Sequence, residues 1–176
     1  MAPVINTFKN NSANIETLVA ITAQHREMLD QVLSVFDIVP DYDLNLMSTN
    51  QTLEGLTGKI LSGISNLLIE LVPDLVFVQG DTTTTFAASL AAFYKKMPVG
   101  HIEAGLRTSN RYSPFPEEIN RRMTSTIATY HFPPTDQAKQ NLLYDGIEQD
   151  KIVVTGNTVI DALFAVSRKV DSDSNT

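Results

Sequence analysis

Apolar positions along the chain follow two alternating patterns. Short continuous apolar runs predict strands buried on both faces, and apolar residues at helical spacing predict helices that pack on one side. The runs predict strands at 15–22, 44–47, 75–78, 98–102, 130–132 and 152–154. The helical spacings predict helices at 24–36, 51–71, 83–96, 117–129, 136–144 and 157–169. Thr135 is the expected N-cap of the fifth helix and Gly146 its stop signal.

Strands that alternate with helices indicate a parallel sheet with right-handed crossovers. We therefore expect an α/β fold, a Rossmann-like parallel sheet with helices on both faces. The 176 residues are enough for one domain, and the chain shows no internal repeat, low-complexity tract or interdomain linker. We place that domain at 1–170 and expect the polar segment 171–176 to be disordered.

Composition narrows the function classes. A net charge of −7 argues against a nucleic-acid partner, because phosphate binding needs clustered Lys and Arg. The absence of cysteine excludes disulfides and suits a reducing cytoplasm, the expected location. His25, His101 and His131 lie far apart and show no metal-ligand spacing, so we expect no metal or other cofactor. No apolar run is long enough for a membrane helix, and neither a GxGxxG motif nor a P-loop is present.

Acidic residues follow two of the predicted strands. Asp81 comes shortly after the run at 75–78, and Glu103 directly follows the run at 98–102. Glu117 and Glu118 come after Pro114 and Pro116 at the start of a predicted helix. In a parallel α/β sheet, ligands bind at the carboxyl ends of the strands. Acids that converge there are suited to proton transfer, so we expect these carboxylates on one side of the domain.

Each acid also has a structural interpretation. Asp81 is a suitable cap for the helix that follows it. Glu103 has Arg107 or Arg111 available for a salt bridge. Gly105 supplies either a turn or a close approach of a ligand to the backbone.

The acids near Pro116 complement a helix dipole in a first turn, the interpretation we prefer for Glu118. Arg121 and Arg122 lie about four residues further on, where ion pairs with both Glu117 and Glu118 are available. Near the N-terminus, a predicted helix begins at His25 and Arg26, just after a strand. These two residues are interpreted either as a solvated helix start or as an anion site.

Five stretches taken together are more specific than any single motif. Residues 22–29, 79–84, 101–108, 114–118 and 154–161 resemble the non-hydrolysing UDP-N-acetylglucosamine 2-epimerases, in the same order and over nearly the whole chain. The resemblance implies the first domain of a glycosyltransferase-B-type fold with two domains. It also implies a reaction in which UDP is eliminated to give 2-acetamidoglucal and is then added back with C2 inverted.

The resemblance carries over to particular residues. The functional acids of the family match Asp81, Glu103 and Glu117 here. UDP-N-acetylglucosamine is the implied substrate and also a possible activator. The residues expected to contact it as substrate or activator are Gln24, His25, Arg26, Gln51 and Arg107.

The chain departs from the family at both ends. Met1 matches an internal methionine of the family, so we expect this chain to lack a preceding strand, its Gly-Thr-Arg-Pro-Glu-like loop and the second domain. We therefore expect the chain to be inactive alone, and a family-like homodimer only in the complete protein. Strands 15–22 and 75–79 are expected to lose a shared neighbour, which would make the chain marginally stable or prone to aggregation. The alternatives are a non-catalytic half that docks to a separately encoded second domain, and a glycosyltransferase or hydrolysing epimerase of similar fold.

Overall fold

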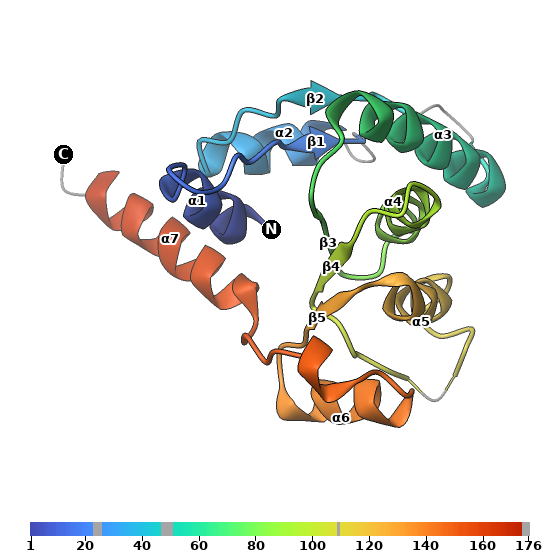
Figure 1. The fold of residues 1–176 in the computed structure, drawn as a ribbon. Coiled ribbons are helices and arrows are strands. Elements are labelled where there is room, and N and C mark those ends of the chain that lie inside the picture. Colours follow the sequence, from blue (N-terminus) through green and yellow to red (C-terminus); the bar gives the residue numbers. More distant parts are fainter. Residues whose placement is uncertain (23–25, 47–50, 109, 174–176) are drawn as a thin grey trace. The chain divides into compact units, whose positions relative to one another are not determined.

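Strands and helices alternate along most of the chain, as the apolar pattern predicts. The structure is a computed structural model that describes residues 1–22, 26–46, 51–108 and 110–173 (Figure 1). The residues form two units: 1–47 with 157–176, and 48–156. The described strands form two parallel sheets, one in each unit. The α/β class expected from the sequence is confirmed.

The first unit is built around a two-stranded sheet. Strand β1 (Ala20–Ile21) pairs in parallel with β2 (Tyr42–Asp43). The helices are α1 (Ala2–Asn10), α2 (Arg26–Val35) and α7 (Thr158–Asp173). Side chains of α1 and α2 pack against a small buried cluster of Val19, Ile21 and Ile38.

The second unit holds a three-stranded parallel sheet in the order β3-β4-β5. The strands are β3 (Val76–Gln79), β4 (Val99–Ile102) and β5 (Tyr130–Phe132). The helices are α3 (Leu53–Leu71), α4 (Thr83–Tyr94), α5 (Glu117–Ile127), α6 (Asp136–Tyr144) and the short 3₁₀ helix η1 (Gln149–Lys151). Helices α4 and α5 pack on each other and lie along the same side of the strands (Figure 1). All four residues of β4 are buried, which fits its central place.

Helix α6 has the predicted bounds because its end signals are local. The Thr135 hydroxyl accepts a hydrogen bond from the backbone N–H of Ala138 at 3.1 Å, which confirms the predicted N-cap. After Tyr144, Gly146 adopts a φ of +87°, a conformation that suits glycine and ends the helix.

Some predicted elements are wrong or shorter. The strand predicted at 44–47 lies at Tyr42–Asp43, although the N–H groups of Leu44 and Leu46 still bond to the neighbouring segment at 2.9 and 3.2 Å. The segment 152–154 makes a single bridge, from Ile152 to His131, and is not a strand. Helix α1 was not predicted, and α7 extends to Asp173, into the segment expected to be a disordered tail.

The strand predicted at 15–22 is reduced to two residues. Ile15 and Leu18 are exposed, at 41% and 43%, so this apolar run is not buried on both faces along its length. Among the described residues no helix combines the length and apolarity needed to cross a lipid bilayer.

Gly105 lets helix α6 approach the chain just after β4. Its φ is +84°, and a Cβ placed there would lie 2.2 Å from the carbonyl oxygen of Ala138. The close approach anticipated from the sequence is therefore made by a helix backbone. The Gly105 carbonyl also accepts a hydrogen bond from the Asn141 amide at 2.9 Å.

Replacing Gly105 by alanine is expected to destabilise the protein by roughly 2–4 kcal/mol, because overpacking adds to left-handed backbone strain. Urea unfolding measures the change. Gly146→Ala is the matched control, since its φ is also positive but no atom lies within 4 Å of the added Cβ. An equal loss of unfolding free energy in the two variants would contradict a cost of the clash with Ala138.

Candidate functional site

Two of the predicted acids lie at the same edge of the three-stranded sheet. Asp81 follows β3 and Glu103 follows β4, and these parallel strands are paired up to Gln79 and Ile102. The Gln79 amide also donates a hydrogen bond to Oε2 of Glu103 at 3.3 Å. The expected placement of Asp81 and Glu103 at the carboxyl ends of adjacent strands is confirmed.

Glu103 has an unusual backbone for its residue type. Its φ is +63°, in the left-handed region that non-glycine residues rarely adopt. The Glu103 N–H is held by the carbonyl of Phe132 at 3.0 Å. Backbone strain of this kind is concentrated at functional sites, where it fixes the direction of a side chain. The strain therefore supports Glu103 as a functional residue.

Asp81 is bound by helix α5. Its Oδ2 accepts hydrogen bonds from Nη2 and Nε of Arg121, at 2.5 and 3.1 Å. Its backbone carbonyl accepts one from the Asn120 amide at 3.0 Å. The capping interpretation of Asp81 is wrong, because Thr82 is the N-cap of α4 and accepts the Thr85 N–H at 3.2 Å.

Glu117 is the first residue of α5, the same helix whose Arg121 holds Asp81. It is half-buried, and its carboxylate has no hydrogen bond or ion pair with the residues that the structure describes. A carboxylate without a protein partner is free to meet a ligand. The three acids thus come from the ends of β3 and β4 and the start of α5.

Glu118 has a different role from its neighbour. Its side chain is 0% exposed and accepts hydrogen bonds from Arg122 Nε (2.7 Å), Thr108 N–H (3.0 Å) and Arg121 Nη1 (3.3 Å). Burial by itself would raise the pKa of Glu118. The hydrogen bond and charge of Arg122 and the donors of Thr108 outweigh it, so the pKa lies below its ordinary value of 4.5.

These contacts correct one expectation about α5 and confirm half of another. Glu118 does more than complement the helix dipole, because its buried carboxylate anchors the loop at Thr108 and the Arg121 that holds Asp81. The pair four residues apart forms between Glu118 and Arg122, whereas Arg121 pairs with Asp81 and Glu118 and leaves Glu117 aside.

Glu118→Gln is expected to lower the free energy of unfolding by about 3 kcal/mol. Removing one partner leaves the other charges of a buried pair uncompensated, which costs roughly 3–5 kcal/mol, and the half-exposed Arg122 places this case at the lower end. Urea unfolding tests the change against Glu117→Gln, a neighbour for which we expect a change within about 0.5 kcal/mol. Similar values for both variants would contradict the structural role of Glu118.

Arg107 does not pair with Glu103. Its guanidinium donates to Asp145 Oδ2 at 2.8 Å, to the Leu106 carbonyl at 2.7 Å and to Ser125 Oγ at 3.1 Å. Arg111 lies over the ring of Tyr112. Neither arginine is a partner of Glu103, so the salt-bridge interpretation of that residue is wrong.

The other predicted binding residues are not brought together in one unit. Gln24 and His25 lie outside the described residues. Arg26, at the start of α2, pairs with Asp43 and, at 3.1 Å, with Asp30 in the first unit. Gln51 belongs to the second unit, just before α3. Their contacts with a ligand stay predictions.

Two buried histidines occupy the sheet below the acids. His101 of β4 and His131 of β5 are register partners, at 0% and 1% exposure. Burial is the main cause that lowers the pKa of each to about 4. Backbone hydrogen bonds, from His101 to Gly80 and from His131 to Ala128, oppose this lowering in part. Both rings are therefore neutral near pH 7.

Sequence patterns missed the residues that support the acids. Arg121 was recognised only as a partner of nearby glutamates, although it reaches Asp81 across 40 positions. No sequence pattern indicated a role for Asn120 at the site. His101 did offer one, a histidine within a strand that is otherwise apolar, where a polar ring needs a specific partner.

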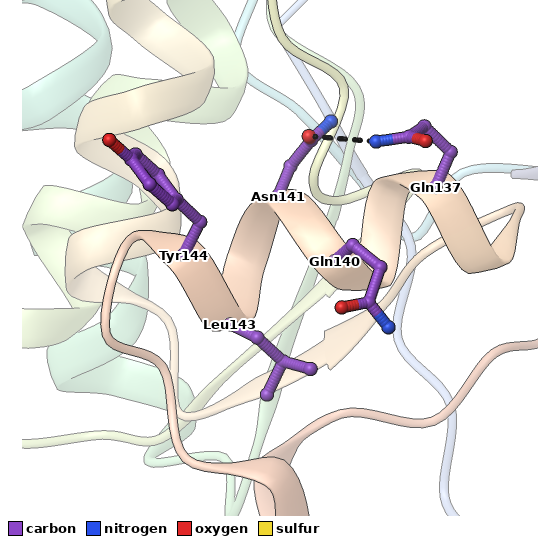
Figure 2. Close-up of a pocket in the computed structure, with 5 residues that line it drawn as sticks. All are labelled: Gln137, Gln140, Asn141, Leu143 and Tyr144. Carbon is purple, nitrogen blue, oxygen red and sulfur yellow. Dashed lines mark hydrogen bonds between the residues drawn. The ribbon is translucent and has the colours of Figure 1, made fainter.

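A hollow elsewhere on the surface does not involve these residues. It is lined by side chains of a single helix, α6, and Figure 2 shows them: Gln137, Gln140, Asn141, Leu143 and Tyr144. Among them, the Gln137 side-chain amide donates a hydrogen bond to Oδ1 of Asn141 at 3.3 Å. None of the predicted site residues takes part, so the acids at the sheet edge remain the candidate site.

Comparisons with known proteins find similar sequences along nearly the whole chain. The family model described as "UDP-N-acetylglucosamine 2-epimerase" matches residues 7–176. A UDP-N-acetylglucosamine 2-epimerase of Neisseria meningitidis serogroup A is 59% identical over 170 residues, 97% of this chain and 45% of the relative. The Escherichia coli K12 enzyme of that name is 55% identical over 172 residues, 98% of this chain and 46% of the relative.

Solved structures are similar as well. The crystal structure of the Neisseria meningitidis enzyme bound to UDP-GlcNAc matches with a TM-score of 0.94 at 59% identity, covering 97% of this chain and 46% of that one. The Methanocaldococcus jannaschii enzyme, in complex with UDP-GlcNAc and UDP, matches with a TM-score of 0.84 at 42% identity, covering 92% and 44%. The chain therefore spans about half the length of the relatives it matches.

Proposed function

Because the chain belongs to the UDP-N-acetylglucosamine 2-epimerase family, we propose that it carries acidic catalytic groups of a non-hydrolysing 2-epimerase. This enzyme interconverts UDP-N-acetylglucosamine and UDP-N-acetylmannosamine. The observation that supports the proposal most directly is the position of the three acids at the ends of neighbouring elements. Asp81 and Glu103 follow adjacent parallel strands, and Glu117 begins the helix that grips Asp81.

The proposed reaction has two balanced halves. A base takes the proton from C2 of the sugar, the C2–H electron pair forms the C1=C2 bond of 2-acetamidoglucal, and the C1–O bond breaks as UDP leaves. In the return step, C2 receives a proton on its opposite face and a phosphate oxygen of UDP forms the C1–O bond again. Electrons and atoms balance without an oxidant or reductant.

This chemistry needs proton-transfer groups on both faces of the sugar. We assign it to Asp81, Glu103 and Glu117. Glu103 and Glu117 have no arginine partner in the described part of the chain, whereas Asp81 has one oxygen held by Arg121. The rigid grip on Asp81 supports a precisely oriented group, and the less constrained acids are free to approach the sugar.

Contacts with UDP-N-acetylglucosamine, as substrate or activator, are proposed for Gln24, His25, Arg26 and Gln51. Arg107 remains a predicted binding residue. Its three hydrogen bonds within the fold also support a role in holding the loop after Glu103 in place.

An exchange experiment in D₂O tests the proposed function. The 176-residue chain is incubated with UDP-N-acetylglucosamine, both alone and joined at its two ends to the segments that flank the matched region in the Neisseria meningitidis relative. The joined protein is expected to form UDP-N-acetylmannosamine that carries deuterium at C2, with 2-acetamidoglucal trapped as an intermediate. We expect little turnover by the chain alone, because positioning by a complete cleft supplies much of the barrier reduction.

The products separate the alternatives. Free N-acetylmannosamine without UDP would indicate the hydrolysing reaction instead. Epimerisation without exchange at C2 would contradict the proton-transfer mechanism. No turnover in the joined protein, when the intact relative is active in the same assay, would contradict the proposed function of this chain.

A further inference from the structure

The end of β3 is held by an unusual set of side-chain hydrogen bonds. Three consecutive backbone carbonyls, immediately before and at Asp81, each accept a hydrogen bond from a side chain of a different element. The pairs are Thr85 Oγ1 with the Gln79 carbonyl at 2.7 Å, His101 Nε2 with the Gly80 carbonyl at 2.8 Å, and Asn120 Nδ2 with the Asp81 carbonyl at 3.0 Å. Helices α4 and α5 and strand β4 thus all fix the same short turn.

The His101 contact determines the position of its proton. A carbonyl oxygen only accepts hydrogen bonds, so Nε2 of His101 must carry the hydrogen. With the pKa of His101 near 4, the ring is neutral at pH 7 and Nδ1 is then bare. That Nδ1 is buried without a hydrogen-bond partner among the described residues. The strand therefore keeps a buried polar ring with one unsatisfied atom, and the bond to Gly80 is what this ring supplies.

The Gly80 carbonyl is a sensitive point for Asp81. Gly80 turns the chain with a φ of +74°, and its N–H is already bound to the Ile102 carbonyl at 3.0 Å. Its carbonyl and the N–H of Asp81 belong to one planar peptide unit. Fixing that carbonyl therefore fixes the plane from which the Asp81 side chain departs. A rotation of this plane would move the Asp81 carboxylate away from Arg121.

We propose that His101 is a positioning residue, whose Nε2–H locks the Gly80–Asp81 peptide and so aims the Asp81 carboxylate. The meaning of this role for catalysis rests on the proposed function of Asp81. A neutral donor suits the position, because burial of the ring disfavours its charged form. The tautomer and the orientation of the turn can be measured whether or not the protein is an epimerase.

The first test is nitrogen NMR of the 176-residue chain at pH 7. Long-range ¹H–¹⁵N correlations distinguish a protonated from a bare ring nitrogen. We expect the proton of His101 on Nε2 and a bare Nδ1. A proton on Nδ1 alone, or on both nitrogens, would overturn the proposal.

The second test compares three variants by their effect on the turn. His101→Leu removes the donor, His101→Gln keeps an amide donor of similar reach, and His131→Leu is the matched control. His131 is the register partner of His101 and equally buried, but its ring bonds to the backbone of Ala128. We expect His101→Leu to shift the Gly80 carbonyl and Asp81 amide signals and to speed exchange of the Gly80 amide, which bonds to the Ile102 carbonyl, about tenfold. His101→Gln is expected to restore them in part.

The control decides between positioning and general destabilisation. His131→Leu is expected to lower stability without shifting Gly80 or Asp81. Equal shifts in both leucine variants would overturn the proposal. If His101→Leu does not fold, His101→Gln decides the question. An unchanged Gly80 carbonyl signal in this variant supports the proposal. Loss of the hydrogen bond to the Gly80 carbonyl in a folded His101→Gln protein overturns it.

An activity measurement then connects the turn to the reaction. In the joined protein, His101→Leu is expected to lower kcat on the order of 100-fold, the effect of a misplacement of about 1 Å, with KM little changed and with partial rescue in His101→Gln. Unchanged kcat would overturn the catalytic part of the inference. Absence of turnover in the unsubstituted joined protein would instead count against the proposed function, while the NMR result stands separately.

Discussion

Glu103→Gln in the joined protein is expected to abolish measurable epimerisation, lowering kcat by about 10²–10⁴-fold. The amide has the shape of the carboxylate but neither takes nor gives a proton at neutral pH. The positive φ of Glu103 and its contact with Gln79 are retained, because glutamine keeps the same backbone and one acceptor oxygen. The measurement is the rate of formation of UDP-N-acetylmannosamine together with deuterium incorporation at C2.

The control for this variant is Glu148→Gln, which changes an exposed glutamate before η1. It is expected to keep the full rate. Thermal unfolding of both variants checks that the fold is intact, and we expect midpoints close to that of the unsubstituted protein. A Glu103→Gln protein that still epimerises would remove Glu103 from the mechanism, while Asp81 and Glu117 would remain candidates.

Acidification from pH 6.5 to pH 4 is expected to cost the protein several kcal/mol of stability. In this window an unfolded histidine binds a proton, whereas His101 and His131 bind one in the folded state only near pH 4. The unfolded state therefore binds more protons, so lowering the pH favours unfolding. The lowered pKa corresponds to at most roughly 3 kcal/mol of folding stability for each histidine. This stability is fully present above pH 6.5 and is lost as the pH falls to about 4.

Urea unfolding at pH 7.5, 6 and 5 measures this loss. The double variant His101→Gln with His131→Gln removes both titrating rings and is expected to flatten the profile over this range. Glu118 affects stability at lower pH than the histidines do, because its pKa in the folded state lies below 4.5. Its contribution to stability is lost only as the pH falls below 4.5 and through the folded-state pKa. Equal stability of the unsubstituted protein at pH 7.5 and 5 would contradict the burial of neutral histidines.

The family resemblance and the placement of the acids come from sequence patterns that are local. Asp81 and Glu103 each follow an apolar run, and parallel strands bring the ends of such runs to one edge. By contrast, residues 152–154 carry the same kind of apolar run and make only one bridge. The pattern indicates which segments are suited to a strand, but it does not indicate how far the pairing with a neighbouring strand continues.

Partners far apart in the sequence are the main features that the patterns did not provide. The hydrogen bond from Arg121 to Asp81 spans 40 positions, and that from Arg107 to Asp145 spans 38. On sequence alone, Arg121 was assigned to glutamates one turn away, because helical spacing is the only geometry that a sequence reveals directly. The packing of α5 against α4 and β4 gives it a second partner, Asp81, besides Glu118.

The sequence by itself determined the family, the α/β class, the ends of α6 and the strand ends that bear Asp81 and Glu103. Helix caps, stop signals and apolar periodicity depend on only a few neighbouring residues, so they can be recognised without knowledge of the rest of the fold. Only the tertiary structure decided that Glu118 is a buried anchor, that Gly105 serves helix α6, and that His101 holds the turn before Asp81. Burial and hydrogen bonding at these positions depend on which elements pack together, and that is a property of the whole fold.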